Sequence, residues 1–137
     1  MSEKFTCSVP VRFRDLDPLN HVNNAVYASY LEEARTAYIE EVLGIEIADN
    51  RFVIANLEID YRKPITLGDD PAVALWITDL GTSSATVAYE FRVDGEAVAE
   101  AETTLVHIDP DSTKPEPFPH DLRERILEAE SHLRATA

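Results

Sequence analysis

Apolar and polar residues alternate along most of this chain, and one segment replaces that alternation with a helical repeat. The period of two is found in five runs, over residues 5–13, 53–61, 73–77, 87–93 and 97–108. It is typical of strands with one buried and one wetted face, as in an antiparallel sheet. Pro10 lies in the first run and cannot donate a backbone hydrogen bond, so this strand is expected at a sheet edge or a bulge.

The segment 24–43 is predicted to form one long helix, because its apolar residues recur at helical spacing. Asn23 and Asn24 offer N-cap chemistry, and Gly44 offers the left-handed residue that ends many helices. At about 1.5 Å per residue the helix is near 30 Å long, enough to cross a sheet. The apolar positions that define it are Tyr27, Tyr30, Leu31, Ala34, Tyr38, Val42 and Leu43.

Five strands and one long helix predict an α+β domain, in which a five-stranded antiparallel sheet curls around a central helix. Asp94-Gly95 predicts a tight hairpin. Residues 109–119 are Pro-rich and are expected to form a linker, and residues 120–135 a short amphipathic C-terminal helix. The length of 137 residues fits a single domain over 1–137.

Composition excludes several classes of function. Twenty-six acidic residues against twelve basic ones give a net charge of −14, so neither nucleic acid nor an anionic membrane is an expected partner. Apolar runs are too short for a membrane span, and the first ten residues lack a signal peptide, which together favour the cytoplasm. A single cysteine, Cys7, and four scattered histidines predict neither an internal disulfide nor a metal site, and no cofactor is expected.

Candidate catalytic residues gather in the segment RDLDPLNHVNN, which links the first strand to the long helix. It carries two carboxylates, three amides and an imidazole directly before a helix N-terminus. The unpaired N–H groups there can polarise a carbonyl, and a nearby carboxylate can attack it or activate water. This arrangement suggests hydrolysis of an activated acyl group, although Asp and Asn are equally suited to an ordinary turn and cap. Asp15 lies close to the end of the first strand, where a structural role is favoured over a catalytic one.

The stretch DLDPLNHVNNAVYASYLEEAR resembles the signature of hotdog-fold thioesterases of the 4-hydroxybenzoyl-CoA thioesterase type. The stretches EIDYRKPITLGDD and GTSSATVAYEFRVDGEAVAEAETTLVHID look like the same family, so the resemblance covers residues 5–109. It implies a hotdog fold and hydrolysis of an acyl-CoA thioester. Asp17 matches the catalytic nucleophile or general base, and Asn24 the residue whose backbone N–H binds the thioester carbonyl. His21 matches a residue that takes part in the active site of related carrier-protein enzymes.

The resemblance also implies a substrate-binding set and an assembly. Asn23 and Tyr27 belong to the set, and the adjacent cations Arg62 and Lys63 suit the phosphates of coenzyme A. Glu32 and Glu33 match the position of the catalytic acid in another branch of the fold, although a solvated or subunit-facing place is favoured for them. Family sites lie between subunits, so a homodimer or homotetramer is expected.

Two other functions stay open at this point. An acyl-carrier-protein thioesterase is one, although an acid found in those enzymes has no counterpart at Lys63-Pro64, and acidic carriers would be repelled. A non-catalytic module that binds acyl-CoA is the other. A hydratase fits less well, because its His-bearing motif on the central helix is missing. The sequence leaves the length and aromaticity of the acyl group undetermined.

Overall fold

The computed structural model describes residues 4–46, 49 and 51–135, and an antiparallel sheet dominates them. Its strands run in the spatial order β1-β3-β4-β5-β2, and every neighbouring pair is antiparallel. The strands are β1 (Phe5–Ser8), β2 (Phe52–Tyr61), β3 (Ala72–Leu80), β4 (Ser84–Val93) and β5 (Glu96–His107). The predicted five-stranded antiparallel hotdog architecture is therefore confirmed.

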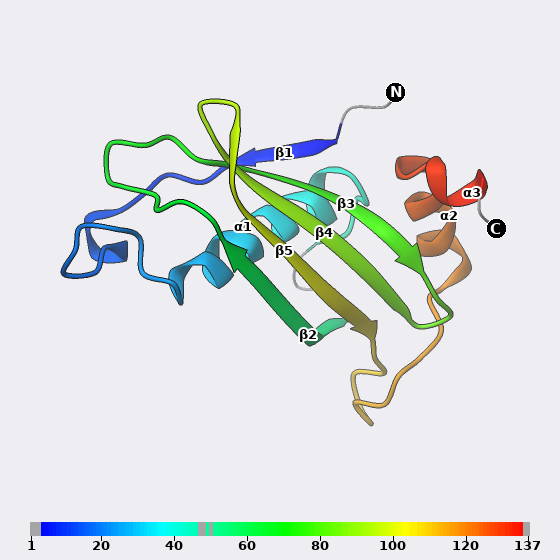
Figure 1. Cartoon of the computed structure of the whole chain (residues 1–137). Helices are drawn as coiled ribbons and strands as arrows, with labels where there is room; N and C mark the ends of the chain where they lie inside the picture. The colour runs from blue at the N-terminus through cyan, green and yellow to red at the C-terminus, as the bar shows by residue number, and fades with distance from the viewer. Residues whose placement is uncertain (1–3, 47–48, 50, 136–137) are drawn as a thin grey trace.

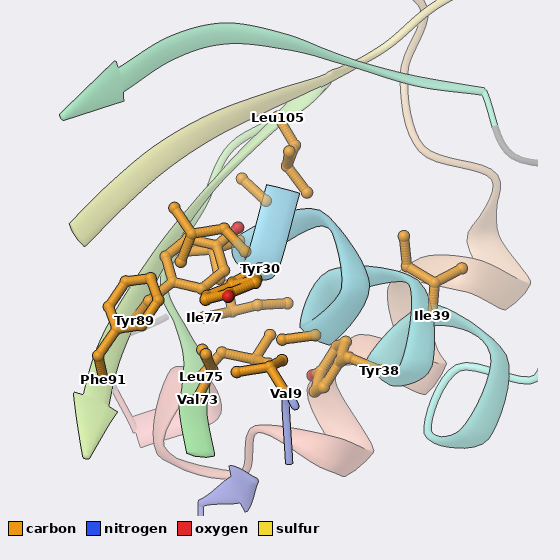
Figure 2. Close-up of a cluster of buried hydrophobic side chains, with 14 of the residues drawn as sticks. Val9, Tyr30, Tyr38, Ile39, Val73, Leu75, Ile77, Tyr89, Phe91 and Leu105 are labelled. Carbon is orange, nitrogen blue, oxygen red and sulfur yellow. The ribbon is translucent and has the colours of Figure 1, made fainter. Parts of the chain in front are cut away.

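The long helix α1 (Val26–Glu41) lies against one face of the sheet and crosses its strands (Figure 1). Tyr30 of α1 lies among the side chains of Leu75, Ile77 and Tyr89 in the core (Figure 2). Six of the seven predicted helix positions are buried; Val42 is the exception, with 37% of its surface exposed. It is the C-cap residue of α1, directly after the last helical residue.

The first strand is shorter than its alternation predicts, because β1 ends at Ser8. After Pro10 the chain leaves the sheet and forms a 3₁₀ turn, η1 (Phe13–Asp15), with Phe13 81% exposed. The expectation that this strand lies at a sheet edge is correct. The other edge, β2, buries less than its pattern suggests: Val53, Ile54 and Leu57 are each 43% exposed.

Two helices follow the Pro-rich linker where the sequence predicts one. They are α2 (His120–Ala129) and α3 (His132–Ala135), and they lie beside the end of β3 (Figure 1). The break falls at Glu130, whose backbone leaves the helical region with φ −118° and ψ 68°. Its buried carboxylate accepts a 2.6 Å hydrogen bond from the Tyr38 hydroxyl, so a tertiary contact accounts for the break.

The predicted turns adopt the backbone that their residues favour. Asp94 and Gly95 both have positive φ, 52° and 80°, as a type I′ hairpin requires, and Gly44 follows α1 with φ 69°. None of the described helices has the length and apolar character that crossing a membrane would need.

Candidate active site

The segment between η1 and α1 folds into a compact loop that is fixed at several points. Leu16 pairs with Val22 across it, and the chain reverses at Asn20, whose φ is 64°. The His21 backbone pairs with Thr66, and the Val22 N–H donates to the carbonyl of Ile65 at 2.8 Å. The link between β2 and β3 thus holds this loop beside the N-terminal end of α1.

Asp17 has one carboxylate oxygen engaged and one available. Its Oδ1 accepts hydrogen bonds from the backbone N–H groups of Leu19, at 2.9 Å, and His21, at 3.1 Å. Its Oδ2 has no hydrogen-bond partner within the part of the chain that the structure describes. The loop backbone therefore orients the side chain through one oxygen, and the other is left for a substrate or a water molecule.

Asp15 anchors the start of the loop to α1. Its buried Oδ2 accepts a 2.7 Å hydrogen bond from the Tyr30 hydroxyl and a 3.0 Å bond from the Arg12 N–H. Burial is the largest single influence and raises the pKa of Asp15. The two hydrogen bonds and the charges of Arg12 and Arg14 together outweigh it, so the pKa lies below its ordinary value. Asp15 also accepts the Asn23 N–H at its carbonyl oxygen, at 2.8 Å.

The turn before α1 includes a backbone donor, that of Asn24, which no described residue uses. The side chain of Asn23 accepts the Ala25 N–H at 2.9 Å in this turn, and the helix begins at Val26, two residues later than predicted, with no side-chain cap from its N-cap residue, Ala25. The Asn24 N–H has no hydrogen-bond partner among the described residues, whereas its carbonyl oxygen accepts the Tyr61 hydroxyl at 2.8 Å. A free N–H at a helix start suits a carbonyl or oxyanion.

A cavity of about 240 Å³ joins these groups. Its rim includes Arg62, which pairs with Glu100 at 3.1 Å, and Lys63, which pairs with Glu96. All four side chains are more than two-fifths exposed, so these pairs are weak. The lining residues are Asp17, His21, Val22, Asn24, Tyr27, Tyr61, Arg62, Lys63 and Pro64.

Most of the residues predicted for the site line this one cavity. Asn23 does not, and its side chain accepts the Ala25 N–H instead; Glu32 and Glu33 lie farther along α1. Glu33 faces Arg12 at 3.7 Å on an exposed surface. Tyr61 also lines the cavity and was not predicted from the sequence; its ring packs edge-on against Tyr27 with centroids 4.8 Å apart. Its place in an alternating strand made it look like an ordinary apolar position.

Within the part of the chain that the structure describes, neither a metal site nor a reactive thiol accompanies this cavity. Among those residues, no three His, Cys, Asp or Glu side chains are grouped so that they could hold a metal ion. Burial, with Glu33 and Glu41 nearby, raises the pKa of the Cys7 thiol and keeps it protonated. A protonated thiol is a poor nucleophile.

Comparisons with known proteins agree with this geometry. The profile of the thioesterase-like superfamily matches residues 11–126. The long-chain acyl-CoA thioesterase FadM of Escherichia coli is 33% identical over 123 residues, which are 86% of this chain and 93% of that protein. The chloroplastic acyl-acyl carrier protein thioesterase ATL3 of Arabidopsis thaliana is 29% identical, over 93% of this chain and 70% of that protein.

A solved structure matches the whole architecture. The crystal structure of a thioesterase from Thermus thermophilus, complexed with coenzyme A and Zn, superposes with a TM-score of 0.85 and 40% sequence identity. The match covers 92% of this chain and 93% of that chain.

Proposed function

Since the chain belongs to the thioesterase-like superfamily, we propose that the cavity at the start of α1 hydrolyses acyl-CoA thioesters with Asp17 as its catalytic carboxylate. The activity is that of a thioester hydrolase: thioester and water give a carboxylic acid and free coenzyme A. One observation carries the assignment of the site. The cavity places a carboxylate with an unused oxygen together with an unused N–H at a helix start.

The two groups divide the chemistry between them. The thioester carbonyl oxygen accepts the Asn24 N–H, which stabilises the negative charge that develops on that oxygen. Asp17 then attacks the carbonyl carbon, or removes a proton from the water that attacks it. In either route the C–S bond breaks, and the sulfur leaves as the coenzyme A thiolate and takes up a proton. The first route leaves a mixed anhydride with Asp17, which water hydrolyses to the free acid and the regenerated carboxylate. His21 lines the same cavity, within reach of the substrate, and Tyr27 forms an apolar wall.

Coenzyme A reaches this cavity past Arg62 and Lys63 in our proposal. Their pairs with glutamates of β5 are solvent-exposed, so phosphate groups can replace the glutamates at small cost.

A carrier-protein substrate is the second candidate, suggested by the Arabidopsis relative. The net charge of −14 opposes docking of an acidic carrier, so we expect a higher kcat/KM for acyl-CoA than for the same acyl group on a carrier protein. The unpaired Cys7 fits a reducing compartment such as the cytoplasm.

We further propose that the protein is a homodimer or larger homo-oligomer that associates through β2. This edge strand exposes three aliphatic side chains, those of Val53, Ile54 and Leu57. Exposed apolar edges of this length are normally paired or covered.

Replacing Asp17 tests the site. Asp17→Asn keeps the size and the Oδ1 acceptor but removes the negative charge, so we expect kcat for thiol release from acyl-CoA to fall about 10²- to 10⁴-fold. Asp94→Asn is the matched control, since it makes the same change at an exposed hairpin turn and should leave kcat unchanged. Wild-type turnover in Asp17→Asn, with an unchanged Tm, would exclude this site.

A single turnover in ¹⁸O-labelled water, combined with trapping of the enzyme by hydroxylamine, distinguishes the two roles of Asp17. If Asp17 attacks the carbonyl and water then cleaves the anhydride at the aspartyl carbon, the first acid released is unlabelled and the enzyme carries the label. If Asp17 activates water, or if water cleaves the anhydride at the acyl carbon, the first acid released carries the label. In the labelled case, conversion of Asp17 to a hydroxamate during turnover identifies the anhydride route, and its absence identifies activated water.

A further inference from the structure

A second cavity lies between α1 and the sheet, farther along the helix, and it contains an arginine. This cavity, of about 290 Å³, is lined by Glu32, Arg35, Thr36, Ile39, Phe52, Ile54 and Leu105. Four of these side chains are large and apolar, so the cavity suits an acyl chain more than water. Neither the catalytic chemistry nor the proposed coenzyme A contacts use it.

Arg35 is partly buried there without a carboxylate partner. Among the described residues no Asp or Glu oxygen lies within 4.0 Å of its guanidinium, in a chain with more than twice as many acids as bases. Its Nη1 donates a hydrogen bond to the Tyr89 hydroxyl at 3.3 Å. Guanidinium has five donors, so most of its hydrogen-bonding capacity is unused by the residues that the structure describes.

Buried hydroxyl groups hold the arginine in place. The Tyr89 hydroxyl is 2.7 Å from Thr103 Oγ1, and both residues are 1% exposed in the centre of the sheet. These neutral groups fix one end of the guanidinium and leave its charge uncompensated. A partly buried, uncompensated cation costs stability, which an anionic ligand would recover.

Both cavities are lined by residues of α1 and β2, but at different ends of these two elements. The catalytic cavity uses Asn24 and Tyr27 at the start of α1 and residues 61–63 at the end of β2. The second cavity uses the middle of α1 and the start of β2. Asn24 and Arg35 are eleven residues apart, about 16 Å along the helix, a span that an extended long-chain acyl group covers.

We infer that Arg35 binds an anionic group at the far end of the acyl chain, so that ω-carboxyacyl-CoA thioesters are preferred substrates. The inference rests on the proposed function, since it needs the thioester at Asp17 and Asn24. Arg35 and a carboxylate form paired, charge-assisted hydrogen bonds. Glu32 is exposed at the rim of the same cavity and more than 4.0 Å from the guanidinium, so water screens its opposing charge.

The experiment compares two substrates in four proteins. Thiol release is measured with a long-chain acyl-CoA and with its ω-carboxy counterpart of equal length, in wild type, Arg35→Gln, Arg35→Lys and Arg92→Gln. Arg92→Gln removes the same charge from β4, where Arg92 pairs with Glu90 outside both cavities. Wild type and Arg92→Gln should prefer the ω-carboxy substrate.

In Arg35→Gln, kcat/KM for the ω-carboxy substrate should fall about 10- to 100-fold, the range for a lost hydrogen bond to a charged group. The plain substrate should change little. Arg35→Lys keeps the charge and should give an intermediate ratio. Wild type that favours the plain substrate, or an unchanged ratio in Arg35→Gln, overturns the inference.

Equal losses on both substrates, together with weakened self-association in sedimentation, also overturn it, since Arg35 then pairs with an acid of a second copy. The proposed function survives each of these results if Asp17→Asn still abolishes turnover of the plain substrate. If wild type hydrolyses neither substrate, the proposed function itself fails.

Discussion

Tyr61 controls the backbone on which the proposed chemistry depends. Its hydroxyl donates to the carbonyl of Asn24, the residue whose free N–H faces the substrate in our mechanism. Tyr61→Phe keeps the ring against Tyr27 and removes only that bond. Since one hydrogen bond contributes about 0.5–1.5 kcal/mol, we expect kcat to fall about 2- to 10-fold with little change in Tm. A change in KM alone would show that Tyr61 serves binding and not the position of Asn24.

Tyr30 stabilises the buried carboxylate of Asp15. Tyr30→Phe removes a hydrogen bond to a charged group and should lower the free energy of unfolding at pH 7 by about 1.5–3 kcal/mol, measured in urea. Because the pKa of Asp15 is lowered in the folded protein, its contribution is present above the ordinary pKa of about 3.9 and is lost as the pH falls.

Between pH 7 and pH 3 the free energy of unfolding of Tyr30→Phe should therefore fall by less than that of wild type. An equal loss in both proteins would show that another carboxylate governs acid unfolding.

At the residue scale the sequence predicted which side chains share the cavity better than it predicted the contacts that position them. Asp17, His21 and Asn24 are close together in the chain, so a local motif sufficed to predict that they line one cavity. Tyr61 and Arg35 reach their partners across 37 and 54 residues, and no local pattern encodes such contacts.

The C-terminal helices are held by a cluster at the edge of β3. The His132 Nε2 lies 2.7 Å from the Ile77 carbonyl, and Glu130 accepts the Tyr38 hydroxyl. Burial raises the pKa of Glu130, although Tyr38, His132 and the Ile77 backbone each lower it in part. The amphipathic pattern predicted the helical content of this region, but the break at Glu130 depends on partners in α1 and β3.

Glu130→Gln tests this cluster. A glutamate with a raised pKa destabilises the folded state increasingly as the pH rises through that pKa. Glutamine keeps the acceptor for Tyr38 and cannot ionise, so the variant should be more stable than wild type at pH 8. The difference in Tm should shrink toward pH 4, where Glu130 is protonated. A variant less stable than wild type at pH 8 would contradict this expectation.

The whole molecule is asymmetric, because one sheet edge is covered far less than the other. Alternation predicted the five strands, yet it could not predict the order β1-β3-β4-β5-β2, which depends on pairings between distant segments. The alternation also predicted more buried residues in β2 than the structure has. A strand at the edge of a sheet has a neighbouring strand on one side only, and most residues of β2 are exposed. The exposed apolar residues of β2 are the basis for the proposed association.

Charges on β2 should prevent that association. In the double variant Val53→Lys/Leu57→Lys we expect the mass in sedimentation equilibrium to fall to that of one chain, because lysines on an edge strand oppose pairing. Val42→Lys is the control, since Val42 is similarly exposed and lies near β1 and β3 at the opposite sheet edge. A monomeric wild type would refute the proposal outright.

The strand that exposes this edge ends at Tyr61, which donates to the carbonyl of Asn24. If a second copy binds this edge, as we propose, we expect it also to steady the start of α1, where in our mechanism the thioester is polarised. Dilution below the self-association constant should then slow turnover per chain, even though no catalytic group has been lost. Protein concentration becomes a means of tuning the enzyme, and specific activity should rise with it toward a plateau.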